Sequence, residues 1–493
     1  MSTLKQRSAK AFAWSMVGRF SNQGIGFVIS IFLARLLAPE DFGMLAMVNV
    51  VIGLAAVLVD MGLGSALIQR QDLKEEHYGS VFYFNVAVGT TLFLLFFFTA
   101  GLVAQFYERP DLKPIMQVMS LNFIISSFCN VQRTWLRKQL KYSVLTKSGI
   151  WSMATGGITG VTLAFLDFGV WALVAQSLIS SLTNNIYVYF FTGWKPKLIL
   201  RKDALKELWG FGFNMFLSGL LDTIYRQLDS LIIGKLFSPA ILGFYFRAKS
   251  LNQFIINYTS GSLMSILFPV LSEIQNQEER YKNVVRRAFH ILNFAVFFIL
   301  GFLFLTAQDI IVILFSAKWL PSVEYFRIIV LAGFVYPFSA LLVNIISSKG
   351  NSRAFLKLEI WKKVVTGLNF AIGFWFGLKG FLYGMIIAQS ISLSFNILFA
   401  SKEMKVQKRW FYQIIWKYLA IFIITAGGLR LIEQFAWQPE SLWLHGILFG
   451  GVFTLLYLGL TRLLRLEGMM IVLEEVKNAD LMGVVRRKIF NKK

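Results

Sequence analysis

IFLARLLAPEDFG (residues 31–43) recurs 200 residues later as LIIGKLFSPAILG (residues 231–243). Each copy ends one apolar run and starts the next after a proline. Three pairs are identical: Leu36 and Leu236, Pro39 and Pro239, and Gly43 and Gly243. Shorter matches follow in the same order: Lys147, Ile150 and Trp151 recur at 357, 360 and 361, and Ala175-Gln176-Ser177 recurs at 388–390. This common order predicts an internal repeat whose offset grows through small loop insertions.

The apolar content of the chain is that of a membrane protein. Of its 493 residues, 56% are hydrophobic and 49 are Phe, and the mean hydropathy is +0.61. A water-soluble fold cannot hide so much apolar surface, so the sequence predicts an all-α polytopic membrane protein. About fourteen spans are expected, at residues 11–36, 41–66, 81–105, 113–133, 143–166, 169–192, 207–235, 240–271, 288–308, 323–347, 354–377, 380–400, 413–432 and 442–463.

The basic residues predict how these spans are oriented. With the N-terminus in the cytoplasm, 37 Lys and Arg fall in cytoplasmic tails, loops and span ends, and the external loops hold four. This asymmetry follows the positive-inside rule and places both termini in the cytoplasm. It also accounts for the net charge of +23 without a nucleic-acid partner. Arg19 interrupts the first apolar run and no cleavage site follows, so the first span is expected to be retained.

The repeat and the span count together predict the domain organisation. Six spans form one repeat unit, and because six is even, both copies enter the membrane in the same direction. The expected parts are a lobe at residues 1–200, a second lobe at 201–405, two further helices at 406–466 and a basic cytoplasmic tail at 467–493. The tail is expected to lie on the anionic inner leaflet as an amphipathic segment or to be solvated.

Charged residues interrupt the seventh span, LSGLLDTIYRQLDSLIIGKL (residues 217–236). Asp222, Arg226 and Asp229 are spaced by four and then three residues, so they share one face of a helix. One interpretation is a ladder in which Arg226 pairs with both carboxylates and braces the helix. The alternative is a stripe that faces a water-filled cavity, because a charge at the bilayer centre costs roughly 2.5–3.5 kcal/mol on insertion scales.

Other charges lie inside predicted spans. They are Arg19 in span 1, Asp60 in span 2, Arg247 and Lys249 in span 8, and Arg327 near the outer start of span 10. Span 1 also carries Ser21, Asn22 and Gln23, and Asn22 is the repeat counterpart of Asp222. Two related helices with polar faces predict a shared central cavity, and guanidinium groups there would suit a phosphate. Arg35 and Lys235 are interpreted as side chains that reach the outer interface.

Several classes of function lack their motifs. The chain has no G-x-x-x-x-G-K-[ST] phosphate loop, so ATP hydrolysis is not expected. Its single cysteine, Cys129, and its three scattered histidines, His77, His290 and His445, predict no metal site. No Ser/His/Asp arrangement, D-x-D pair or large external loop supports catalysis. The protein is therefore not expected to be an enzyme, and no cofactor is expected.

Two longer stretches resemble a known family. They are LARLLAPEDFGMLAMVNVVIGLAAVLVDMGLGSALIQRQ (33–71) with VFYFNVAVG (81–89), and QLDSLIIGKLFSPAILGFYFRAKSL (227–251) with LFPVLSEIQ (267–275). They resemble the polysaccharide-transporter branch of the MATE-like flippase superfamily, and most closely the Wzx-type exporters of colanic-acid and teichuronic-acid repeat units. The similarity extends over essentially the whole chain.

This resemblance implies a function. Members move a polyprenyl-diphosphate-linked oligosaccharide across the bacterial cell (inner) membrane, by alternating access of two lobes and at the expense of an ion gradient. It implies contact with membrane lipids and work beside polysaccharide polymerase or assembly proteins. A cationic cavity would then bind the diphosphate, with Arg19, Arg226, Arg247 and Lys249 as the candidates. Asp222, Asp229 and Asp60 are the candidates for coupling H⁺ or Na⁺.

Two other functions are alternatives. A cation-coupled exporter of small drugs shares the fold, but such exporters usually have twelve spans and favour acidic cavities. Spans 13 and 14 and the intramembrane arginines argue against it. An integral-membrane glycan-processing enzyme would need a catalytic base and usually a sizeable external loop, and the sequence offers neither.

Overall fold

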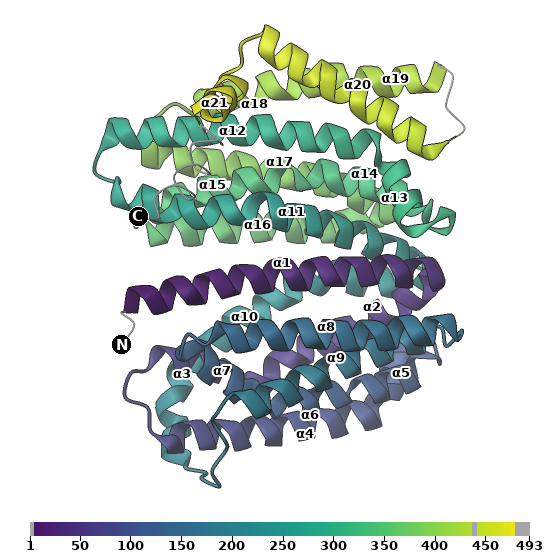
Figure 1. The fold of residues 1–493 in the computed structure, drawn as a ribbon, viewed down its shortest axis with the longest axis vertical. Helices are drawn as coiled ribbons and strands as arrows, with labels where there is room; N and C mark the ends of the chain where they lie inside the picture. The colour runs from purple at the N-terminus through teal and green to yellow at the C-terminus, as the bar shows by residue number, and fades with distance from the viewer. Residues whose placement is uncertain (1–3, 436–440, 479–493) are drawn as a thin grey trace, which may run out of the picture. The chain divides into compact units, whose positions relative to one another are not determined.

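The computed structural model describes residues 4–435 and 441–478, and every regular element within these ranges is a helix (Figure 1). The chain forms two compact units, residues 1–246 and 247–493. The first unit contains α1 (Leu4–Leu36), α2 (Pro39–Asp60), α3 (Leu63–Gln69), α4 (Glu75–Phe106), α5 (Leu112–Met119), α6 (Leu121–Ser127), α7 (Asn130–Lys138), α8 (Tyr142–Phe165), α9 (Val170–Phe191), α10 (Lys202–Leu236) and the first turns of α11 (Pro239–Glu273).

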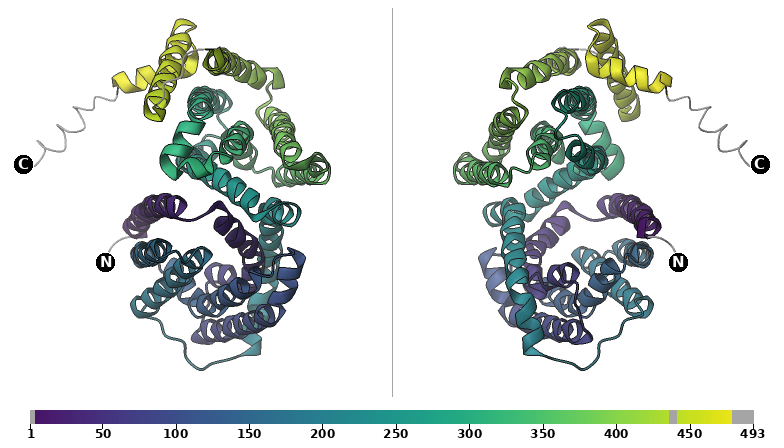
Figure 2. Two further views of the ribbon diagram at one scale, coloured as in Figure 1. Left: turned by 90° about the vertical axis from the view of Figure 1, so that its right-hand side faces the viewer. Right: turned by 90° about the vertical axis from the view of Figure 1, so that its left-hand side faces the viewer.

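The second unit continues from α11. It contains α12 (Glu278–Leu305), α13 (Ala307–Phe315), η1 (Ala317–Trp319), α14 (Ser322–Gly333), α15 (Val335–Ser348), α16 (Ser352–Gly373), η2 (Phe374–Phe376), α17 (Gly377–Met404), α18 (Lys408–Phe422), the π-helical η3 (Ile423–Gly427), α19 (Gly428–Phe435), α20 (Leu442–Leu463) and α21 (Glu467–Asn478). Most helices of each unit are seen nearly end-on in Figure 2.

Close helix pairs form the first unit. α8 packs along α9, α1 packs along α8, and α10 packs on α2 and α3. Small residues permit these approaches: a Cβ on Gly18 of α1 would lie 2.6 Å from the Thr146 hydroxyl oxygen of α8. At the predicted cytoplasmic end, residues of α3, α4, α7 and α10 and of the segment between α9 and α10 bury an apolar cluster that includes Leu67, Phe82 and Trp194.

Aromatic side chains fill the core of the second unit. α12 packs against α18, α20 and α21, and α17 packs against α14, α15 and α16. Phe289 of α12 lies with its ring centroid 5.7 Å from that of Phe338 and 5.1 Å from that of Phe411. Such ring pairs add to the free energy of burial, so they fix how these helices meet.

Among the described residues, fewer helical segments are long and apolar enough to cross a membrane than the fourteen predicted spans. Within the described residues, eight helical segments are long and apolar enough to cross a membrane, or nine if the bent pair 112–127 and 130–138 is one span. Each of the fourteen predicted ranges lies on one helix or on consecutive helices. α8, α9 and α10 are not among these segments, because their Gly, Ser, Asn and charged residues lower the mean hydropathy. Fourteen crossings remain a prediction.

The repeat is visible at the helix ends. α1 ends at Leu36 and α10 at Leu236, and α2 begins at Pro39 and α11 at Pro239. Proline at the first helical position loses no intrahelical hydrogen bond, so each proline starts a helix where the previous one has ended. The predicted lobes divide at residue 200, but the compact units divide at residue 246. The later division arises because α10 packs on α2 and α3 and so belongs to the first unit. The lobes remain a prediction about the repeat.

The predicted cytoplasmic tail begins with a docked helix. α21 packs against α12, and the Gly468 amide donates a 2.9 Å hydrogen bond to the Tyr418 hydroxyl. Arg286 of α12 donates from Nε to a Glu467 carboxylate oxygen at 3.0 Å. The first part of the tail is therefore held by the second unit, and residues 479–493 lie outside the described residues.

Candidate functional site

Asp222 and Arg226 form an exposed ion pair in the middle of α10. Their charged groups are 2.9 Å apart, and the side chains are 58% and 73% exposed. An ion pair of this kind at i and i+4 contributes about 0.3–0.5 kcal/mol on a helix surface in water. In hydrocarbon it would be costly, so this face of α10 requires water or a polar ligand. The structure thus brings together two of the predicted site residues.

Asp229 does not share that exposure. The residue is 8% exposed, and its carboxylate accepts hydrogen bonds from the Ser230 amide at 2.7 Å and the Tyr245 hydroxyl at 2.5 Å. Tyr245 belongs to the first turns of α11, which fold back on α10 after the turn at Pro239. The predicted stripe is therefore split, because α11 covers its outer end and leaves Asp222 and Arg226 open.

Arg19 is exposed on α1, next to the glycine that packs against α8. Asn22 lies on the packed face: a Cβ on Gly149 of α8 would fall 2.4 Å from its amide nitrogen. The polar residues of span 1 thus point in different directions, and the repeat counterpart of Asp222 contributes to helix packing. Arg19 remains a candidate for the cavity.

Asp60 ends α2 and caps α3. Both carboxylate oxygens accept from the Gly64 amide, at 3.1 Å each. Between the two helices, Met61 and Gly62 adopt left-handed backbone conformations, with φ of 44° and 73°. Asp60 therefore holds a break between two helices, and its predicted role in ion coupling remains untested.

Arg247 and Lys249 belong to the second unit. The guanidinium of Arg247 lies 4.7 Å from the ring centroid of Phe315 and 5.0 Å from that of Trp319, and the residue is 4% exposed. This aromatic enclosure offers a cation–π environment in place of solvent. Lys249 is half-buried. The structure thus places the four basic candidates in different settings, and Arg226 is the one exposed beside the carboxylate of Asp222.

Two polar clusters were not predicted. In the first unit, Arg133 of α7 donates from Nη2 to Asn184 at 3.0 Å and also to Asn185, both on α9. The Cys129 thiol donates to the Asn185 carbonyl at 3.2 Å. These contacts join segments more than 50 residues apart. The sequence offered no signal for them beyond Asn-Asn inside an apolar helix.

The second cluster surrounds His445 of α20. Its Nδ1 lies 2.9 Å from an Asp309 carboxylate oxygen on α13, and its Nε2 lies 3.5 Å from Glu433 on α19. Arg430 pairs with Glu433 on the same helix. Asp309 is 2% exposed and Glu433 is 7% exposed. Buried charges persist when they are paired, so this cluster ties α19 and α20 to α13.

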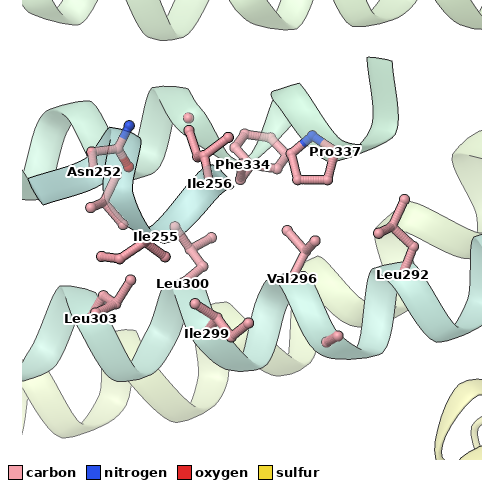
Figure 3. A pocket seen from close by; sticks show the side chains of 13 residues that line it. Asn252, Ile255, Ile256, Leu292, Val296, Ile299, Leu300, Leu303, Phe334 and Pro337 are labelled. Carbon is pink, nitrogen blue, oxygen red and sulfur yellow. The ribbon is translucent and has the colours of Figure 1, made fainter. Parts of the chain in front are cut away.

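A small apolar cavity lies in the second unit between α11, α12, α14 and α15 (Figure 3). Its volume is about 70 Å³, and its lining is aliphatic or aromatic apart from Asn252. Pockets for small molecules are typically about 300–1,000 Å³ with several converging polar groups. This cavity is therefore a packing gap and not a glycan site.

Most of the chain is similar to known proteins. An uncharacterized membrane protein in the cps region of Klebsiella pneumoniae is 22% identical over 81% of this chain and 83% of its own. The succinoglycan biosynthesis transport protein ExoT of Rhizobium meliloti (strain 1021) is 26% identical over 62% of each chain. The inward closed conformation of the lipid II flippase MurJ has the same fold, with a TM-score of 0.69, 15% identity, and coverage of 92% of this chain and 99% of that one.

These likenesses confirm the predicted fold class and the predicted resemblance to polysaccharide transporters. The family model for polysaccharide biosynthesis proteins matches residues 32–324, more than half of the chain. This range contains all of the second copy of the repeated stretch, 231–243, and the first copy from residue 32 onward, so it includes both Pro39 and Pro239. The chain therefore belongs to the family of polysaccharide biosynthesis proteins.

Proposed function

We propose that this protein moves a polyprenyl-diphosphate-linked oligosaccharide from the inner to the outer leaflet of the bacterial cell membrane. Three likenesses support this function. The family is one of polysaccharide biosynthesis, ExoT is named a transport protein, and MurJ is named a lipid II flippase. Lipid II is itself a polyprenyl-diphosphate-linked glycan, so a shared fold is compatible with a related cargo. The protein is a transporter and not an enzyme.

The observation that carries the proposal is the exposed Asp222–Arg226 pair on α10. A transmembrane surface in contact only with lipid does not retain two charged side chains without cost. A glycan diphosphate supplies hydroxyl groups and negative charge, and it needs a wet, partly cationic path. Arg226 is therefore assigned to the diphosphate and Arg19 to a second contact with it, because guanidinium donors match phosphate oxygens.

The energy source follows from the same chemistry. The cargo is uncharged or anionic at its sugar and anionic at its diphosphate, and no nucleotide-binding loop is present in the sequence. An ion gradient of H⁺ or Na⁺ would then drive the cycle, with Asp222 as the most exposed carboxylate of the three candidates. A polymerase or assembly protein would receive the product at the outer leaflet. Both termini are assigned to the cytoplasm on the charge distribution.

The pool of lipid-linked oligosaccharides tests this function. Polyprenyl-diphosphates would be extracted from cells depleted of the protein and analysed by mass spectrometry. Accumulation of one complete repeat unit with loss of the surface polymer is expected. An incomplete repeat unit would indicate a synthetic enzyme instead. An unchanged pool with altered sensitivity to cationic drugs would indicate export of small molecules and would overturn the proposal.

A further inference from the structure

The first turns of α2 and α11 meet at the two glycines that the repeat relates. A Cβ on Gly43 would lie 1.8 Å from the Pro239 carbonyl oxygen, and a Cβ on Gly243 would lie 1.9 Å from the Pro39 carbonyl oxygen. Each glycine thus lies against the proline that begins the other helix. No residue with a side chain fits at either position unless the two helix ends move apart.

The contact is reciprocal, and this follows from the repeat. The four residues occupy equivalent places in two copies, with helices starting at Pro39 and Pro239. Because a local two-fold relation connects the copies, the contact of Gly43 with Pro239 and the contact of Gly243 with Pro39 are equivalent. Backbone atoms provide the contact, so its closeness depends on both glycines at once.

Neighbouring side chains close in on the same place. A Cβ on Gly234 of α10 would lie 3.0 Å from a Tyr107 ring carbon, 3.2 Å from Met47 and 3.3 Å from Leu242. Met47 is 1% exposed and Leu242 is fully buried. The meeting of α2 and α11 is therefore sealed in this structure, and water has no access to Leu242.

The turn between α4 and α5 holds both helix ends. Glu108 accepts a 2.7 Å hydrogen bond from Lys235, in the last turn of α10, and Arg109 lies 2.5 Å from Glu40, in the first turn of α2. Glu108 has a φ of 57°, the left-handed conformation that non-glycine residues seldom adopt. This backbone conformation marks a sharp turn, from which consecutive side chains reach two different helices.

The geometry points to this contact as the external gate of the translocation path. The gate comprises Pro39 and Gly43 of α2 and Pro239 and Gly243 of α11. It also includes two ion pairs, Glu108 with Lys235 and Arg109 with Glu40, which are here called the clasp. It is closed in this structure and would part when the glycan leaves on the outer side. The charge distribution places the helix ends at 36–39 and 236–239 outside. The inference rests on the proposed function, because only a transporter needs such a gate.

The interactions at this contact are of a kind that can break and form again. Ion pairs and backbone contacts join the helix ends, and surface ion pairs contribute about 0–1 kcal/mol each. Parting them exposes charged groups to water at little cost. Parting the helix ends also uncovers Met47 and Leu242, and the loss of this apolar burial favours the closed state.

Cysteine accessibility tests the gate without reference to any cargo. Cys129 is the only cysteine and is 2% exposed, so Cys129→Ala removes the background. Leu242→Cys is then labelled in intact cells by a membrane-impermeant maleimide, alone and with Gly43→Ala or Gly243→Ala. The expected result is labelling at least about tenfold faster with either alanine, because a contact that cannot form shifts a two-state equilibrium toward the open state.

Gly101→Ala is the matched control. Gly101 is a helical glycine of α4 with no neighbouring atom within 4 Å of an added Cβ. Equal labelling rates in the Gly43, Gly243 and Gly101 variants, each extracted as a monodisperse protein, would overturn the gate. Glu108→Gln with Arg109→Gln provides a second route that leaves the glycines intact, and it should also speed labelling.

The lipid-linked oligosaccharide pool of depleted cells separates the two proposals. Faster labelling together with a normal pool would refute the proposed cargo and leave an opening contact between α2 and α11. Unchanged labelling together with an accumulated pool would refute the gate and leave the transport function in place.

Discussion

The Tyr245 hydroxyl on α11 donates a 2.5 Å hydrogen bond to the Asp229 carboxylate on α10. The two residues lie on either side of the turn at Pro239, so the bond holds a helix hairpin together. Arg226 and Asp222, one turn and two turns before Asp229 on α10, remain exposed. One charged stripe thus contains a structural carboxylate and an exposed ion pair, and their variants should behave differently.

Tyr245→Phe should lower stability more than transport. It leaves a buried carboxylate without its hydroxyl donor, and a hydrogen bond to a charged group contributes about 1.5–3 kcal/mol. The expected result is a lower thermal unfolding midpoint in detergent, with export per folded molecule preserved. Tyr336→Phe, at a tyrosine that is 55% exposed in the second unit, is the control. Loss of export from a protein of normal stability would show that Asp229 takes part in coupling.

Arg226→Ala should lower transport more than stability. The exposed pair contributes about 0.3–0.5 kcal/mol, so the unfolding midpoint should hardly move. Export should fall by about tenfold or more, because removing a charged hydrogen bond to phosphate from a desolvated path costs at least about 1.4 kcal/mol. Arg226→Lys should recover part of the export, since it restores the charge without the planar fork. Full export by the folded alanine variant would favour the brace interpretation of this pair.

Local features of the fold could be predicted from the sequence, and tertiary contacts could not. The helix ends at Leu36 and Leu236 follow from the prolines and the repeat, and they lie at or within one residue of the predicted span ends at 36 and 235. The same helical spacing places Asp229 and Arg226 on one face of α10, but their exposure differs because a folded-back helix covers Asp229 and leaves Arg226 exposed. Helical periodicity describes a single helix and carries no information about which neighbour covers it.

The histidine cluster shows the same limit over a longer distance. His445 looks isolated in the sequence, and its partner Asp309 lies 136 residues away. Nothing in the local pattern of either segment indicates the other. Only the packing of α20 on α13 brings the imidazole and the carboxylate together.

Asp309→Asn should detach α20 from α13. The Asp309 carboxylate is a buried hydrogen-bond partner of the His445 imidazole, and leaving a buried polar group without its partner costs about 1–3 kcal/mol. The thermal unfolding midpoint should fall clearly, and the double variant Asp309→Asn/His445→Gln should lose less than the sum of the two single variants. Glu279→Gln is the control, since its contact with Lys282 is long, at 3.7 Å, and its side chain is 86% exposed. Additive losses would show that Asp309 and His445 are not coupled.

Acid should loosen the clasp of the proposed gate. The Lys235 ammonium holds the pKa of the Glu108 carboxyl below its ordinary value of 4.5, first through its hydrogen bond and then through its charge. A lowered pKa means that the pair is intact above 4.5 and is lost as the pH falls through the lowered value. Maleimide labelling of Leu242→Cys is too slow in acid, so parallel samples would be exposed to a methanethiosulfonate reagent. Its rate, corrected with a free thiol for the pH dependence of the reagent, should be flat between neutral pH and about pH 5 and should rise below 4.5.

Glu108→Gln removes the carboxylate that pairs with Lys235, while Glu40 and Asp111 remain beside Arg109, so labelling at neutral pH should already be faster than in the wild type. Glu279→Gln, at an exposed carboxylate of the second unit, should retain the wild-type profile. A wild-type profile in the Glu108 variant would mean that the pair with Lys235 does not restrain α10. The closeness of α2 and α11 would then depend on Gly43 and Gly243 alone, and only the alanine variants at those positions would open the contact.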